Sequence, residues 1–156
     1  MSESFKETLN LLKDSDLSDF SKFSSRGIEK ESLRVFDKTI SFTDHPTSLG
    51  STLTNQYITT DFSEALLELI TNKKNSIDES LSELEDVLNF VFKNCSETIW
   101  PSSVPCTIED ENKIRIAEYG SSNSGRLKNL YRKGLSERYG SMMPVSYTHL
   151  RAHETR

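Results

Sequence analysis

The sequence of 156 residues predicts an α+β fold. Residues 76–92 place apolar side chains at the three- and four-residue spacing of a buried helix face. Residues 26–35 and 52–60 are instead rich in residues that favour strands, and polar connections separate these segments. Helices and strands in one chain of this length indicate a single domain, or part of a larger one.

The composition excludes several classes of protein. Hydrophobic residues make up 34% and charged residues 28%, which is polar for a globular domain but not the composition of a disordered chain. The net charge is −5 and no basic stripe is present, so nucleic acid is not an expected partner. No run of 18 apolar residues occurs, so no membrane span is expected. The N-terminal residues do not resemble a secretory signal, so we expect a cytoplasmic protein. The oligomeric state is left open.

The elements follow in order along the chain. A first helix is expected over residues 3–14, with an apolar stripe suited to packing. Residues 26–35 form a strand, residues 37–39 a tight turn, and residues 40–42 a short return strand. Pro46 can begin a short helix, and residues 52–60 are a further strand candidate.

The segment 63–70 is compatible with either a helix or a strand. Its Glu, Ala and Leu residues favour a helix, but it is short and Thr71 follows it. In both conformations Glu64 and Glu68 share one face. Two clearer helices follow, over residues 76–92 and over the basic segment 127–139.

The strand over residues 26–35 carries two acids, Glu29 and Glu31, that point to the same face. Two carboxylates this close repel each other unless they face water or share a cation. A hard divalent ion such as Mg²⁺ would relieve the repulsion, because it prefers oxygen ligands. The alternative is a solvated strand face on which Lys30 and Arg34 screen the acids.

Other motifs carry weaker predictions. Residues 120–126 are small and precede a helix, but they lack the Gly-Lys-Ser/Thr ending of a phosphate-binding loop, so a plain loop is favoured. Cys106 has no cationic neighbour in sequence and is expected to be a packed thiol. His45 precedes a proline and is expected to be a structural turn residue.

The C-terminal tail is set aside from this reasoning. Residues 145–155 read VSYTHLRAHET, which resembles the in-frame translation of an adapter used in DNA library preparation. We therefore expect residues 1–143 to be the natural segment and residues 144–156 to be an unstructured artefact. His149 and His153 lie in this tail, so their spacing carries no weight as a metal motif.

Four ordered motifs carry a resemblance to a known family. They are RGIEKESLRV from residue 26, ITTDFSEALLELIT from residue 58, WPSSVPC from residue 100, and YGSSNSGRLKNLYRKGL from residue 119. Between residues 23 and 143 the chain resembles the N-terminal part of bacterial glutamate–cysteine ligase. The resemblance implies the N-terminal part of a glutamine synthetase-like catalytic fold, with a curved, mostly antiparallel sheet and outer helices, and it implies that residues 64–70 form a strand.

The same resemblance implies an activity and a site. The family is an ATP-dependent acid–amino-acid ligase (EC 6.3.2.2) that joins the γ-carboxyl of glutamate to cysteine through γ-glutamyl phosphate, the first step of glutathione biosynthesis. Its small-molecule partners are glutamate, cysteine and ATP, and its cofactor is Mg²⁺. The acids that match the family's metal ligands are Glu29, Glu31, Asp61 and Glu68, and the residues that match its cysteine pocket are Phe62, Tyr131 and Leu135. No role is assigned to Glu64.

The family chain is several times longer than this one, so we expect the 156-residue polypeptide alone to be inactive. Two alternatives stay open. One is a related carboxylate–amine ligase with the same acids but another amine acceptor near Tyr131. The other is a non-catalytic α+β binding module in which the acids are merely solvated.

Overall fold

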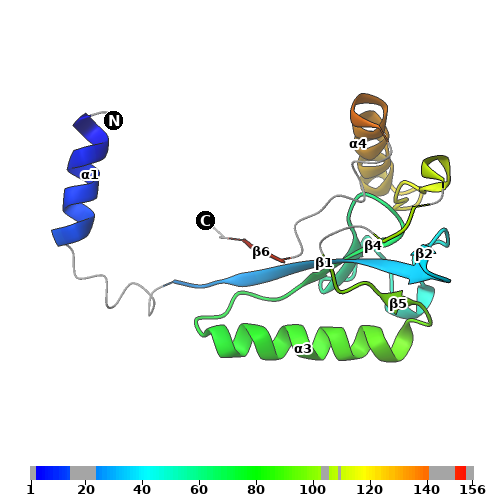
Figure 1. The fold of residues 1–156 in the computed structure, drawn as a ribbon, viewed down its shortest axis with the longest axis horizontal. Helices are drawn as coiled ribbons and strands as arrows, with labels where there is room; N and C mark the ends of the chain where they lie inside the picture. The colour runs from blue at the N-terminus through cyan, green and yellow to red at the C-terminus, as the bar shows by residue number, and fades with distance from the viewer. Residues whose placement is uncertain (1–2, 15–23, 103–105, 109, 141–149, 154–156) are drawn as a thin grey trace.

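The computed structural model describes residues 3–14, 24–102, 106–108, 110–140 and 150–153, and shows an α+β arrangement around one antiparallel sheet (Figure 1). The predicted fold class is confirmed in these residues. Its α-helices are α1 (Glu3–Asp14), α3 (Ile77–Asn94) and α4 (Asn123–Tyr139). Helices α3 and α4 lie on opposite sides of the sheet in Figure 1.

Strand β1 (Gly27–Phe36) is the centre of the sheet. It pairs with β4 (Leu66–Ile70), which pairs in turn with β3 (Ile58–Thr60). The far end of β1 pairs with β2 (Thr39–Ile40) and β5 (Thr98–Ile99). All of these pairings are antiparallel. Because successive side chains of a strand point to opposite faces, β1 presents one row of side chains to each face of the sheet.

The turn between β1 and β2 follows from its residues. Asp37 and Lys38 both have positive φ, at 48° and 68°, which is the conformation of a two-residue hairpin turn with the twist of its strands. Strand β2 is shorter than the predicted return strand over residues 40–42, since only Thr39 and Ile40 pair with β1. Likewise, of the strand candidate 52–60 only β3 is a strand.

The ambiguous segment 63–70 is a strand in its second half. The helical propensity is overridden because β4 lies between β1 and β3, which satisfies its backbone groups on both edges. A turn precedes β4, in which the Asp61 amide donates to the Leu66 carbonyl at 3.0 Å. Glu64 lies in this turn, so the expectation that Glu64 and Glu68 share a face is wrong.

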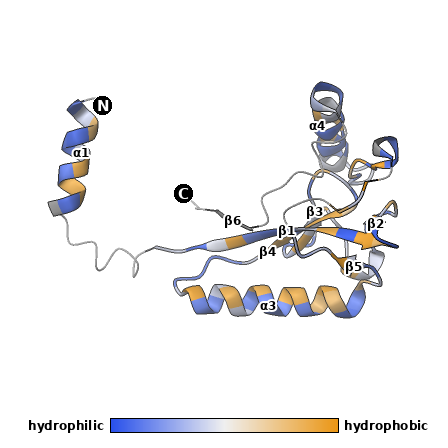
Figure 2. Cartoon of the chain, in the orientation of Figure 1, coloured by the Kyte–Doolittle hydropathy of each residue, from blue (hydrophilic) through white to orange (hydrophobic). Residues whose placement is uncertain are grey.

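The two faces of the sheet bury different clusters. On one face Leu67 and Leu69 pack with Leu84, Val87 and Val91 of α3. On the other face Leu33 and Leu66 pack with a second cluster that includes Ile114. Figure 2 shows the hydrophobic residues of α3 alternating with hydrophilic ones along the helix. The core therefore fixes which side chains of β1 and β4 point away from α3.

The ends of the chain depart from the predictions. Helix α1 forms as expected, but its apolar stripe is exposed, with Leu11 at 69% and Phe5 at 51%. Helix α4 begins at Asn123, four residues before the predicted start, because the Ser122 hydroxyl accepts from the Gly125 amide and caps it. Short 3₁₀ turns occur at Thr47–Leu49, after Pro46, and at Glu111–Lys113.

The tail contains one described strand, β6 (Leu150–His153), which pairs antiparallel with residues Gly27 to Lys30 of β1. At these four positions the structure differs from the expectation of an unstructured tail. The physical reason is the edge of β1 opposite β4, whose backbone groups can pair with any extended segment. The rest of the tail lies outside the described residues.

None of the described helices is long and apolar enough to span a membrane.

Candidate functional site

The sheet face opposite α3 gathers carboxylates from two neighbouring strands. Glu31 of β1 lies directly opposite Glu68 of β4 in the antiparallel register. Glu29 lies two residues before Glu31 and therefore on the same face. Directly opposed residues place their Cβ atoms about 5 Å apart. The structure thus brings Glu68 to the adjacent pair Glu29 and Glu31, from which it is distant in sequence.

Asp61 joins this face from the turn that follows β3. Its carboxylate lies 3.7 Å from the Arg132 guanidinium of α4 and is 42% exposed. The Arg132 Nε also donates to the Asp61 carbonyl oxygen. Arg132 therefore holds both the backbone and the side chain of Asp61. We call Glu29, Glu31, Asp61 and Glu68 the acidic cluster.

The protonation of Glu68 reports the crowding of these acids. Its pKa is raised to about 7, first by burial and then by the charges of Asp61, Glu29 and Glu31. Arg132 acts in the opposite sense but does not cancel the effect. A bound cation would favour the charged form of Glu68, and carboxylate oxygens are the ligands that Mg²⁺ prefers.

The donor set of the acidic cluster fits a divalent cation chemically. Within the described ranges, however, no group of three or more His, Cys, Asp or Glu residues is already gathered in a form that could hold a metal ion. The four sequence-predicted acids therefore share a region and influence one another, and their role as metal ligands stays a prediction.

The screening alternative fails for the two basic residues of β1. Lys30 and Arg34 alternate with Glu29 and Glu31 and point to the opposite face. Arg34 is completely buried and forms an ion pair with Glu97. The Lys30 ammonium donates to the Ser32 hydroxyl, and burial lowers its pKa. Neither cation neutralises the acidic cluster from its own strand.

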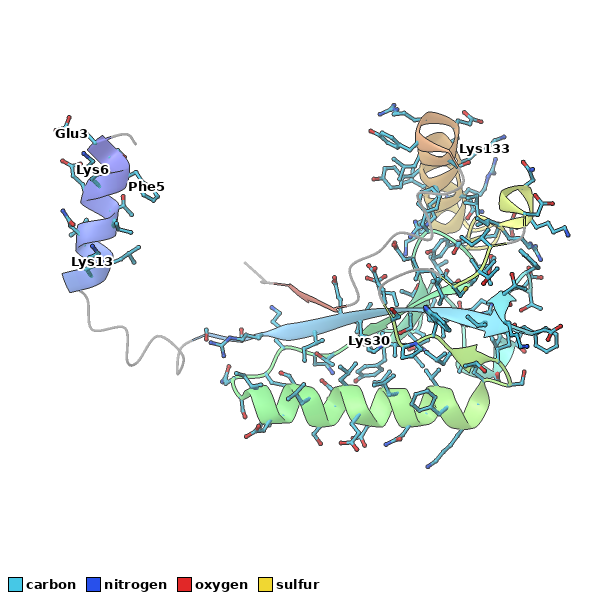
Figure 3. The ribbon with its side chains drawn as sticks, in the orientation of Figure 1. Glu3, Phe5, Lys6, Lys13, Lys30 and Lys133 are labelled. Carbon is cyan, nitrogen blue, oxygen red and sulfur yellow. The ribbon has the colours of Figure 1, made fainter. Side chains whose placement is uncertain are left out.

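The expected cysteine-pocket residues are separated by burial. Phe62 is buried next to Asp61, whereas Tyr131 is 64% exposed on α4 and Leu135 is half-buried one turn later. A cavity of about 630 Å³ lies beside α4, and its lining includes Ile116, Leu127, Leu130 and Lys133. Phe62, Tyr131 and Leu135 are not among the residues that line it. Lys133, labelled in Figure 3, lies on the side of the sheet away from α3. The substrate role of Phe62, Tyr131 and Leu135 stays a prediction.

Sequence reasoning missed the function of two buried side chains near the acidic cluster. The Glu64 carboxylate accepts from the backbone amides of His45, at 2.8 Å, and Glu118, at 2.7 Å. The Tyr119 hydroxyl donates to the carbonyls of Thr60 and Asp61. Nothing in the local sequence marks Glu64 or Tyr119, because both act on backbone groups of distant segments.

His45 and Cys106 have the properties of buried structural residues rather than of catalytic ones. Burial, and then the charge of the nearby Arg34, lower the pKa of His45 to about 4, so His45 is neutral at neutral pH. Cys106 is buried, which raises the pKa of its thiol, as expected for a packed residue rather than a nucleophile. Of the small-residue segment 120–126, for which a plain loop is expected, residues 120–122 precede α4 and Ser122 caps it, whereas residues 123–126 form the first turn of the helix.

Comparison with known proteins gives a consistent result. The sequence model of the family described as glutamate-cysteine ligase matches residues 9–149. The glutamate–cysteine ligase of Yersinia pseudotuberculosis is 52% identical over 120 residues, which cover 76% of this chain and 23% of the relative. That of Vibrio vulnificus is 49% identical over 122 residues, or 77% of this chain and 23% of the relative. The chain thus spans about a quarter of the length of these curated relatives.

Two solved structures share the fold. The glutamate–cysteine ligase of Francisella tularensis, in complex with AMP, superposes with a TM-score of 0.78 at 45% identity, covering 83% of this chain and 26% of that one. A bifunctional glutathione synthetase from Pasteurella multocida superposes with a TM-score of 0.76 at 28% identity, covering 91% of this chain and 18% of that one.

Proposed function

The chain belongs to the glutamate–cysteine ligase family, and from this premise we propose that it supplies the metal-binding sheet face of an enzyme that makes γ-glutamylcysteine. ATP would phosphorylate the γ-carboxylate of glutamate, and the cysteine amine would then displace phosphate from the resulting acyl phosphate. This is the first step of glutathione biosynthesis. The observation that carries the proposal is the acidic cluster, in which burial, and then the charges of the three other carboxylates, raise the pKa of Glu68 to about 7.

We propose Mg²⁺ as the cation and Glu29, Glu31, Asp61 and Glu68 as the residues that hold it. When bound, Mg²⁺ would neutralise the charge that accumulates between ATP and the glutamate carboxylate. The chain's own residues prepare this face. The β1–β4 register sets Glu31 against Glu68, and Arg132 holds Asp61 beside them. The core packing of Leu67 and Leu69 against α3 keeps the acids on the opposite face.

The metal assignment is tested by removing one charge at a time in the full-length ligase that contains this segment. We expect Glu31→Gln or Glu68→Gln to lower Mg²⁺-dependent γ-glutamylcysteine formation by about 100-fold. A bound metal stabilises the transition state by several kcal/mol, and the loss of one ligand removes part of that stabilisation. Glu85→Gln is the matched control, since Glu85 is exposed on α3 on the other side of the sheet. Unchanged activity in both acidic-cluster variants would refute the metal role.

We propose that the amine acceptor is cysteine and that Phe62, Tyr131 and Leu135 contact it. Tyr131 and Leu135 lie four residues apart on α4 and so on one helix face, on the element that also contacts Asp61. In the full-length ligase, Tyr131→Ala and Leu135→Ala should raise the KM for cysteine and leave the KM for ATP near its wild-type value. Screening other amines with the wild-type enzyme decides between cysteine and a different acceptor.

We also propose a cytoplasmic location. The thiols of Cys95 and Cys106 are both free. Free thiols suit a reducing compartment, where a cysteine substrate also stays reduced.

A further inference from the structure

Tyr119 connects two parts of the proposed site that are distant in sequence. Its side chain is buried, with 3% of the residue exposed. The hydroxyl donates to the carbonyl oxygens of Thr60 and of Asp61, the latter at 3.0 Å. The Thr60 hydroxyl donates back to the Tyr119 oxygen at 3.3 Å. The end of β3 and the first residue of the following turn are therefore tied to Tyr119.

The ring of Tyr119 contacts α4 at the same time. The Lys128 ammonium and the Arg132 guanidinium each lie 4.6 Å from the ring centroid, which is within the range of cation–π attraction. The Tyr119 amide also donates to the Asn129 side chain at 2.8 Å. Since Arg132 reaches the carboxylate and the carbonyl of Asp61, Tyr119 and α4 hold the same residue from two directions.

The segment that carries Tyr119 is itself anchored. The Glu64 carboxylate accepts from the Glu118 amide, and the Ala117 amide donates to the Phe62 carbonyl at 2.9 Å. Gly125 allows the start of α4 to approach closely, because a Cβ at this position would lie 2.2 Å from the Tyr119 carbonyl oxygen. Tyr119 therefore has contacts at its backbone amide, at its ring and at its hydroxyl.

We propose that Tyr119 is a positioning residue that sets the Asp61 carboxylate for metal binding and links that position to α4. The inference rests on the proposed function, because it assumes that Asp61 is a metal ligand. Without the Tyr119 hydroxyl, the Thr60 and Asp61 carbonyls lose a buried donor, and the turn after β3 gains freedom to move. Tyr119 touches neither substrate nor metal in this account and acts only through Asp61.

The test compares Tyr119→Phe with wild type in the full-length ligase. This variant removes one oxygen and keeps the ring that contacts α4. Without metal, hydrogen–deuterium exchange of peptides that cover residues 60–66 should be at least about tenfold faster. Mn²⁺ binding, followed by electron paramagnetic resonance, should weaken by about tenfold, as expected for the loss of one hydrogen bond. The kcat should fall at saturating Mg²⁺ with little change in the KM for ATP.

Tyr57→Phe is the matched control. Its hydroxyl also has a side-chain partner, the Asn72 amide at 3.0 Å, but that contact lies near α3 and away from Asp61. The control should match wild type in Mn²⁺ affinity and in exchange over residues 60–66. If Tyr119→Phe lowers the Tm but leaves both of these measurements unchanged, Tyr119 is only structural and the inference is wrong.

The experiments distinguish a failure of the Tyr119 inference from a failure of the proposed function. Exchange needs no catalysis, so it decides whether Tyr119 holds the turn even where the wild-type enzyme forms no product. If wild type forms γ-glutamylcysteine and Tyr119→Phe binds Mn²⁺ as wild type does, only the role of Tyr119 is overturned. If wild type binds no Mn²⁺, the metal assignment of the acidic cluster fails, and the inference about Tyr119 fails with it.

Discussion

Single carboxylates decide how this sheet face responds to pH. For Glu68 the pKa is raised from 4.5 to about 7 in the folded protein. Between these values the folded state binds more protons than the unfolded state. The contribution of Glu68 to stability is therefore full below about pH 4.5 and is lost as the pH rises through 7. Bound Mg²⁺ should reverse this trend, because it favours the charged carboxylate.

Glu68→Gln tests this linkage. Glutamine resembles the protonated acid at every pH, so the metal-free variant should be more stable than wild type at pH 8, by about 1 kcal/mol after allowance for partial solvent exposure. At pH 4.5 the two should unfold alike. Thermal melts of the full-length ligase in chelator, at both pH values, measure this difference, and Glu85→Gln serves as the neutral control. A variant no more stable than wild type at pH 8 would contradict the raised pKa.

Arg34 is the second residue whose role is set by burial. Its guanidinium pairs with Glu97 and donates to the carbonyls of Thr43, Asp44 and Glu64 at 2.9 to 3.1 Å. These contacts join β1 to the segments before β3 and β4. Removing one partner of a buried pair leaves an uncompensated charge.

We expect Arg34→Met to lower the free energy of unfolding by about 3–5 kcal/mol. The double variant Arg34→Met with Glu97→Leu should recover only part of this loss, because the three carbonyls still lack their donor. Urea unfolding followed by circular dichroism measures both variants. A decrease in the free energy of unfolding of less than about 1 kcal/mol for the single variant would contradict this prediction, because it would show that water can replace the guanidinium.

At the scale of elements, the sequence predicts long periodic segments well and short ones poorly. The apolar spacing of residues 76–92 predicts α3 almost to its ends. Residues 63–70 carry no such signal, since their conformation depends on β1 and β3 on either side, which lie outside any local window. The early start of α4 comes from the Ser122 cap, and it also needs Gly125, because only a residue without a Cβ fits against the Tyr119 carbonyl. That close approach is a tertiary contact that residue types alone do not indicate.

Helix α4 offers two glycines with opposite expectations. Gly134→Ala meets no atom within 4 Å and should stabilise the helix by about 1 kcal/mol. Gly125→Ala would push the helix start away from the Tyr119 carbonyl and should cost about 1–3 kcal/mol. Denaturant unfolding of both variants in the full-length ligase compares them directly. Equal effects would mean that α4 does not pack against Tyr119 as described.

At the scale of the molecule, the acidic cluster shows what the sequence can and cannot predict. The pair Glu29 and Glu31 follows from strand alternation alone. The approach of Glu68 and Asp61 follows from register and from a turn, and only the family resemblance pointed to it beforehand. The roles of Tyr119 and Glu64 could not be predicted from the sequence, because their partners are backbone groups, which every residue contains.

We propose that residues 144–156 are not part of the ligase sequence. The family match extends to residue 149, and β6 pairs with the edge of β1, so neither feature by itself identifies the origin of these residues. Long-read sequencing of the source locus across the codon for Met143 decides it. We expect the frame to continue with codons other than those for residues 145–155. The same codons in the genome would show that the tail is natural.

The last prediction concerns the 156-residue chain by itself. It spans 23% of the length of the Vibrio vulnificus relative, so most of the residues of that protein have no counterpart in it. A phosphoryl transfer that depends on positioning and charge neutralisation needs residues on all sides of the nucleotide. The purified chain with ATP, glutamate, cysteine and Mg²⁺ should therefore form no γ-glutamylcysteine detectable by mass spectrometry, whereas the full-length ligase should form it under the same conditions. Product from the chain alone would mean that the acidic cluster and α4 suffice for the reaction.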